Sequence, residues 1–85
     1  MVIFHLVVFA KGGYNMKNLY FIRSNGERIL VEPKIKEDNT IKFIKKFVKE
    51  KNPDFEIYYI RSWEEDGGTM YDVGSHTEFF LLSDI

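Results

Sequence analysis

The stretch between Asp38 and Pro53 constrains the fold most, because it is the one segment with the periodicity of an amphipathic helix. Asp38-Asn39-Thr40 offers three candidates for the N-cap, and Asn52-Pro53 closes the segment. Apolar residues recur on one side and lysines gather on the other, namely Ile41, Phe43, Ile44, Phe47 and Val48 against Lys42, Lys45, Lys46 and Lys49. We therefore predict one helix of about three turns, whose apolar side needs a sheet to lie on.

A β-hairpin is predicted before this helix. Asn25-Gly26 separates two strand-like segments, residues 17–23 and residues 28–32. Asn-Gly is typical of a type I′ turn, because both central positions of that turn need a positive φ angle. Pro33 is expected to end the second strand, since proline cannot donate a hydrogen bond to a neighbouring strand.

Further strands are predicted after the helix. Residues 55–63 form the longest strand candidate, and a turn at residues 64–68 follows. Residues 69–73 are predicted to form the returning strand of this hairpin. Gly74 permits a bulge or kink, and residues 77–82 continue the strand. The predicted order is ββαββ, an α+β fold in which an antiparallel sheet carries the amphipathic helix on one face.

Residues 16–85 are predicted to form a single domain, because they contain no repeat, linker or low-complexity segment. Apolar residues make up 45% of the whole chain, which is sufficient for a packed core. A domain this small buries limited surface, and its sheet has open edges. A homodimer would relieve both problems, so we favour a homodimer over a monomer.

Residues 1–10 form the most apolar run of the chain. The run is too short to span a bilayer, and no basic residue precedes it as in a signal peptide, so we expect no membrane association. Residues 11–16 can be encoded by a string that holds a bacterial ribosome-binding site. One hypothesis therefore makes Met16 the true start and residues 1–15 a translated leader. The other is that residues 2–9, rich in β-branched and aromatic side chains, add an extra N-terminal strand.

The chain has 12 basic and 13 acidic residues and a net charge of −1, so no global field draws it to nucleic acid. The charge is nevertheless uneven. Residues 34–51 hold seven lysines and three acids, whereas residues 54–85 hold eight acids and one arginine. Such polarity suits docking by complementary charge or head-to-tail self-association. The helix lysines could follow a phosphate backbone, but a solvated face is the simpler interpretation, and we expect no direct nucleic-acid binding.

Motifs of the common enzyme classes are missing from the sequence. It contains no cysteine, which removes disulfides, thiolate metal ligands and thiol nucleophiles. It contains no P-loop, no G-x-G-x-x-G and no G-x-S-x-G segment. Its two histidines, His5 and His76, cannot by themselves form a multi-histidine zinc site. We therefore predict a protein that is not an enzyme and that carries no cofactor or metal.

Asp72, Gly74, His76 and Glu78 would share one face if their strand ran unbroken, because side chains alternate along a strand. Asp, His and Glu together can bind a divalent metal or perform acid–base chemistry. An alternative function follows, in which these residues and Trp63 line the pocket of a small-ligand-binding protein, such as a nucleotide-signal sponge, or of a weak metal-assisted hydrolase. The simpler interpretation is that His76 is a structural, hydrogen-bonded residue after a kink.

Trp63 stands beside three acids, and an aromatic anchor rimmed by carboxylates is typical of a protein-binding hot spot. Such a site could compete for a basic groove that normally holds nucleic acid. The alternative is that Trp63 packs in the core at the end of its strand. The candidate binding residues are therefore Trp63, Glu64, Glu65, Asp66, Asp72, His76 and Glu78.

The segment from Tyr71 to Phe80 (YDVGSHTEFF), with Trp63 upstream, resembles the ending of small uncharacterised phage and prophage proteins of low-GC Gram-positive bacteria. The likeness spans residues 16–82, is specific only near that ending and brings no catalytic residues. Small phage accessory proteins of this kind often inhibit host systems, as anti-CRISPR and other anti-defence proteins do. The resemblance implies a non-enzymatic protein in the cytoplasm of a bacterial host cell, which binds and inhibits a host macromolecule, with a host protein as the expected partner.

Overall fold

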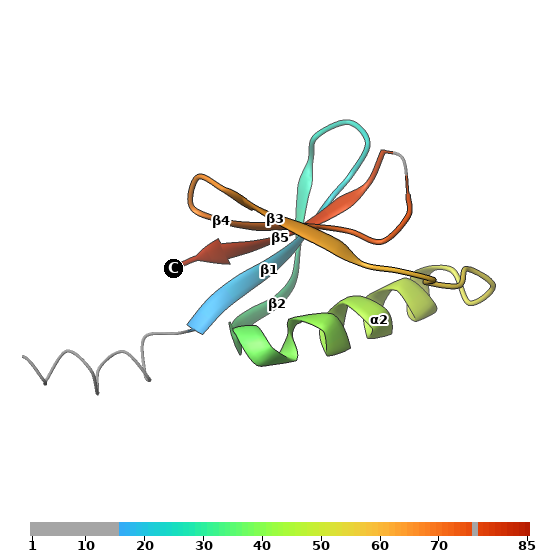
Figure 1. Cartoon of the computed structure of the whole chain (residues 1–85), viewed down its shortest axis with the longest axis horizontal. Helices are drawn as coiled ribbons and strands as arrows, with labels where there is room; N and C mark the ends of the chain where they lie inside the picture. The colour runs from blue at the N-terminus through green and yellow to red at the C-terminus, as the bar shows by residue number, and fades with distance from the viewer. Residues whose placement is uncertain (1–15, 76) are drawn as a thin grey trace, which may run out of the picture.

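The computed structural model describes residues 16–75 and 77–85, which form a five-stranded antiparallel sheet with one helix on a single face (Figure 1). The strand order is β2-β1-β5-β4-β3, so that β2 and β3 are the two edges. The predicted α+β class is thereby confirmed. The two hypotheses for residues 1–15, a translated leader and an extra strand, concern a segment outside the described residues.

The first hairpin joins β1 (Met16–Ile22) to β2 (Arg28–Lys36), as predicted. The expected type I′ turn is wrong, because Gly26 has a φ angle of +89° but Asn25 has no positive φ. The backbone N–H of Gly26 instead donates to the Arg23 carbonyl oxygen across 2.8 Å, and the backbone N–H of Glu27 donates to Oδ1 of Asn25 across 2.9 Å. The expected end of the strand at Pro33 is wrong, because β2 continues to Lys36. Proline is tolerated here since β2 is an edge strand, on which a missing N–H need not break a ladder.

The helix forms as the periodicity predicts. A short 3₁₀ turn, η1 (Glu37–Asn39), leads into α2 (Thr40–Lys51). Asn39 occupies the N-cap position, but its side chain makes no capping hydrogen bond. The Thr40 hydroxyl instead donates to the Glu37 carbonyl oxygen across 2.7 Å, which ties the helix to the 3₁₀ turn before it.

The second half of the chain contains one strand more than predicted, and the observed order is ββαβββ. Residues 55–60 lie outside the sheet, and β3 begins only at residue 61 (Arg61–Glu65). The expected continuous strand across Gly74 is wrong. This segment instead forms two antiparallel strands, β4 (Gly68–Asp72) and β5 (Phe79–Asp84), which pair with each other. Gly74 has a φ angle of +103° in the connection that reverses the chain.

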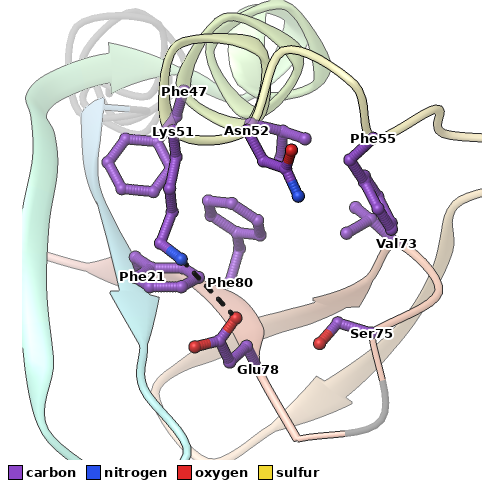
Figure 2. Close-up of a pocket in the computed structure, with 10 residues that line it drawn as sticks. Phe21, Phe47, Lys51, Asn52, Phe55, Val73, Ser75, Glu78 and Phe80 are labelled. Atoms are coloured by element: carbon purple, nitrogen blue, oxygen red, sulfur yellow. Dashed lines mark ion pairs between the residues drawn. The ribbon is translucent and has the colours of Figure 1, made fainter.

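Three phenylalanines from different elements pack where α2 meets the sheet (Figure 2). Phe21 of β1, Phe47 of α2 and Phe80 of β5 have ring centroids 5.0 to 5.7 Å apart, and the Phe47–Phe80 pair is edge-to-face. Tilted and edge-to-face pairs at this spacing are the favourable arrangements of aromatic rings. This cluster fixes the C-terminal half of α2 over the centre of the sheet.

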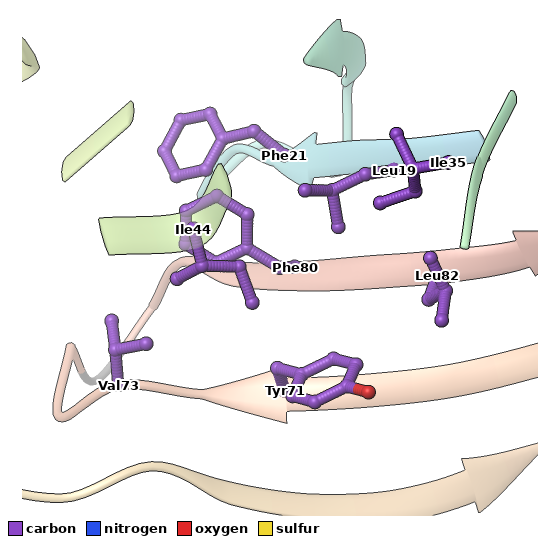
Figure 3. Packing of buried hydrophobic residues seen from close by; sticks show 8 residues of the cluster. All are labelled: Leu19, Phe21, Ile35, Ile44, Tyr71, Val73, Phe80 and Leu82. Carbon is purple, nitrogen blue, oxygen red and sulfur yellow. The ribbon is translucent and has the colours of Figure 1, made fainter. Parts of the chain in front are cut away.

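The main core lies between α2 and the face of the sheet that it covers (Figure 3). Ile44 comes from the helix, and the side chains of β1, β4 and β5 that alternate toward the helix complete the layer. The buried apolar residues of this cluster are Leu19, Phe21, Ile35, Ile44, Tyr71, Val73, Phe80 and Leu82. In residues 16–75 and 77–85, no helix is long and apolar enough to cross a membrane.

The opposite face of the sheet, here called the open face, carries no helix and is nonetheless rich in apolar side chains. Leu81 lies between the core residues Phe80 and Leu82 in sequence, so it points to the open face, where it is only 7% exposed. Its neighbours in register are Tyr20 on β1 and Met70 on β4. The same alternation places these apolar residues on the open face: Tyr20, Ile22, Leu30, Trp63, Met70, Phe79 and Leu81.

Candidate functional site

A groove of about 390 Å³ lies at the end of the open face, where β3 and β4 meet the reversing turn after β4. Its position follows from the register, which sets Arg61 opposite Asp72 and Trp63 opposite Met70. We call it the Trp63 groove. Its lining combines three aromatic rings with an ion pair and the small residues of the turn, namely Tyr59, Arg61, Trp63, Asp72, Gly74, Ser75 and Phe79.

Trp63 is held in one orientation by two neighbours. Its indole Nε1–H donates to Oε2 of Glu65 across 2.7 Å. Its ring meets the ring of Phe79 edge-to-face, with centroids 6.1 Å apart. The side chain is nevertheless 38% exposed and lies outside the buried cluster, so the alternative of a core tryptophan is wrong. A fixed, half-open aromatic ring is suited to contact with a ligand or partner, because little rotamer freedom is lost on binding.

The floor of the groove contains an ion pair between Arg61 and Asp72, with Nη2 and Oδ2 2.7 Å apart. The Asp72 side chain is 8% exposed, whereas that of Arg61 is 67% exposed. The hydrogen bond to Asp72 and the charge of its carboxylate raise the pKa of the Arg61 guanidinium above its usual range. Arg61 therefore stays charged and presents its outer N–H groups to solvent.

Glu64, Glu65 and Asp66 follow Trp63 toward the tip of the β3–β4 hairpin, and all three are exposed. Figure 1 shows this hairpin between β3 and β4. Glu65 shares the open face with Trp63, whereas Glu64 alternates to the other side of the strand. Within the described part of the chain none of the three makes an ion pair. The hairpin tip is thus an acidic edge with an aromatic ring beside it.

The predicted grouping of Asp72, His76 and Glu78 depended on an unbroken strand, and the chain reverses between β4 and β5 instead. Asp72 bonds Arg61 in the Trp63 groove, while Glu78 lies near Lys51 of α2, with Oε1 and Nζ 3.9 Å apart. His76 lies outside the described residues. Among the residues that are described, no group of three or more His, Asp or Glu side chains could hold a metal ion.

Sequence reasoning identified Trp63 and Asp72 but missed three other residues of the groove, Tyr59, Arg61 and Phe79. Alternation along β3 could have placed Arg61 beside Trp63, because the two are separated by one residue. The position of Phe79 depends on the pairing of β4 with β5 and could not be read from local sequence. Comparison with protein-family models, curated proteins and solved structures finds no match to this chain.

Proposed function

We propose that this protein is a non-enzymatic binding protein, which attaches to a basic surface of a host protein through the β3–β4 hairpin and thereby inhibits it. The observation that carries the proposal is the fixed, half-exposed Trp63 on the same hairpin as Glu64, Glu65 and Asp66, which form no ion pair within the described chain. Buried aromatic anchors supply most of the energy of protein interfaces, and complementary charge around them supplies speed and specificity.

The two edges of the sheet differ in a way that supports this choice of surface. The outer strand β2 carries Pro33, two register shifts and a left-handed Lys34 with a φ angle of +52°, all of which hinder pairing with another strand. β3 has none of these features, and all five of its residues are exposed. Glu64 and Glu65 make the end of this edge near the hairpin tip acidic, so a basic partner would complement it.

The resemblance to phage and prophage proteins supplies the host-directed part of the proposal. A surface that is acidic and aromatic can occupy a basic groove in which a host protein otherwise holds nucleic acid. The proposed class is therefore an anti-CRISPR or other anti-defence inhibitor acting in the cytoplasm of the bacterial host. An inhibitor that acts by occupying such a groove needs no catalytic residue and no cofactor.

The test uses the tagged full chain as bait in a lysate of a low-GC Gram-positive bacterium, at low and at high salt. The variant E64K/D66K should lose the retained host protein, with affinity reduced about tenfold or more. W63A should weaken binding at least as strongly, because it removes the aromatic anchor. Wild-type binding should fall steeply with added salt, since exposed charges are screened.

The matched control is D38K/E50K, which makes the same change of charge at two exposed acids on the helical side of the molecule. This variant should retain the host protein as the wild type does. Equal retention by E64K/D66K and by D38K/E50K would show that the hairpin is not the interface. A loss with both variants would show an effect of net charge and would equally overturn the proposal.

One observation favours a second candidate, binding of a nucleotide signal. The Trp63 groove has a volume within the range of small-molecule sites and offers aromatic rings for stacking beside the charged Arg61. The two candidates predict opposite effects of one variant. E64K/D66K should weaken binding of a basic protein, whereas it should strengthen binding of an anionic cyclic dinucleotide by removing repulsion. Isothermal titration of the wild type, E64K/D66K and R61A with that probe separates them.

A further inference from the structure

A second pocket, of about 190 Å³, opens on the helical side of the sheet and shares only Ser75 with the Trp63 groove. It lies between the C-terminal end of α2, β1 and the turn that precedes β5 (Figure 2). Four phenylalanines, Phe21, Phe47, Phe55 and Phe80, line it together with Val48 and Val73. We call it the phenylalanine pocket.

The size and lining of the phenylalanine pocket fit one small ring. Small-molecule sites for drug-sized ligands have volumes of about 300 Å³ or more, whereas an apolar cavity of about 150 Å³ accepts benzene. At about 190 Å³ this pocket lies between these values. Rings already pack edge-to-face in its wall, which is the geometry that a further aromatic ring can join.

The rim of the pocket carries one charge of each sign. Lys51 at the end of α2 and Glu78 before β5 are 50% and 31% exposed, so both side chains reach solvent. Their 3.9 Å separation is too long for a hydrogen bond, which leaves each group able to take a closer partner. The Lys51 ammonium also lies 5.3 Å from the centroid of the Phe21 ring, which keeps it over the apolar wall.

Uncharged polar groups complete this rim. Asn52 and Ser75 also line the pocket, and Figure 2 shows the Asn52 amide pointing toward the space beside Phe80. Asn52 is the C-cap of α2, so the pocket lies at the end of the helix, where the backbone dipole favours a positive group. A ligand ammonium near Glu78 would be stabilised both by the Glu78 carboxylate and by the helix dipole.

We propose that the phenylalanine pocket binds a free monocyclic aromatic α-amino acid. The ring enters between the phenylalanines, the carboxylate pairs with Lys51, and the ammonium pairs with Glu78. Each charge of the zwitterion replaces the long contact between these two residues by a closer one. An aromatic acid without the ammonium leaves Glu78 to repel it, and an aromatic amine without the carboxylate leaves Lys51 to repel it.

The experiment is an NMR titration of the isotopically labelled full chain with L-phenylalanine. Saturable shifts should appear at backbone amides around the pocket. Phenylacetate, which lacks the ammonium, and phenethylamine, which lacks the carboxylate, should each bind about tenfold more weakly. Leucine, which keeps both charges without a ring, should also bind more weakly.

Two rim variants and a matched control complete the test. K51M and E78Q should each weaken phenylalanine binding about tenfold, because each removes one charged partner of the ligand. K49M/E50Q makes the same changes on α2 outside the pocket lining and should leave the affinity unchanged. Non-saturable shifts would overturn the proposal. Equal binding of phenylacetate, phenethylamine and phenylalanine, or unaltered binding by K51M and E78Q, would overturn it as well. The titration contains no partner protein, so its result is independent of the proposed host interaction.

Discussion

Asp72 links the edge strand β3 to the turn that follows β4. Its Oδ2 accepts a hydrogen bond from Nη2 of Arg61 on β3 across 2.7 Å. Its other carboxylate oxygen, Oδ1, accepts the backbone N–H of Gly74 across 2.8 Å. The side chain of Asp72 is almost fully covered, so both bonds form in partly buried surroundings. One carboxylate thereby holds β3 against β4 and begins the reversal of the chain toward β5.

Asp72→Ala should lower the free energy of unfolding by about 1–3 kcal/mol, because it leaves a backbone N–H and a guanidinium without their acceptor. Asp72→Asn should have a smaller effect, since the amide oxygen can still accept one of the two bonds. Urea denaturation measures both. The control is Asp66→Ala at an exposed position, which should change stability by less than about 0.5 kcal/mol. Equal losses from Asp72→Ala and Asp66→Ala would contradict this role for Asp72.

Gly68 at the start of β4 is predicted to tolerate no side chain, because a Cβ atom there would overlap the backbone carbonyl of Leu82 on the central strand β5. Gly68→Ala must push the strands apart and should cost about 1–3 kcal/mol of stability. Gly67→Ala is the informative comparison. Nothing lies near its added Cβ, but its φ angle of +82° strains an alanine by about 1–2 kcal/mol. The added Cβ of Gly68→Ala should also shift the amide resonances along β5, whereas Gly67→Ala should affect only that of Asp84, whose N–H donates to the Gly67 carbonyl oxygen.

The parts of the fold that depend on local signals could be predicted from sequence. The hairpin at Asn25-Gly26 follows from turn residues between two strand-like segments, although only Gly26 takes a positive φ angle, and α2 needs only its apolar periodicity. Both are confirmed. The exposure of the helix lysines also agrees with the predicted polar side.

The reversal between β4 and β5 could not be predicted in the same way. Residues on both sides of Gly74 have strand-like sequences, so local propensity alone allows one kinked strand. Two interactions make it two strands: the bond from Gly74 to Asp72, and the pairing of β5 with β1, about sixty residues earlier in the chain. The candidate site depends on the pairing of β4 with β5 that this reversal creates, which explains why Trp63 was identified and Phe79 was not.

Leu81 and Leu82 are consecutive on β5 but should respond differently to a charge. Leu82 is fully buried under α2, so Leu82→Lys should abolish folding, because a lysine there has neither water nor a partner. Leu81 is covered only by neighbours on the open face, such as Tyr20 and Met70, and a lysine there can extend to solvent. Leu81→Lys should retain a dispersed NMR spectrum with reduced stability. A folded Leu82→Lys variant, or an unfolded Leu81→Lys variant, would contradict this assignment of faces.

The stability of the fold should decline at strongly alkaline pH, because Tyr71 titrates from within the core. Burial raises the pKa of the Tyr71 phenol above its ordinary value of 10.0, although a hydrogen bond with Thr40 acts in the opposite direction. Because the pKa of this phenol is higher in the folded than in the unfolded chain, its protonated form stabilises the fold. This contribution is fully present below the unfolded-state pKa and is lost as the pH rises through the folded-state pKa. Urea midpoints should therefore fall above about pH 10, and Tyr71→Phe should reduce this fall. Tyr58→Phe, at a side chain that is 86% exposed, should leave the fall unchanged. An equally steep fall in Tyr71→Phe would show that another group controls the alkaline limit.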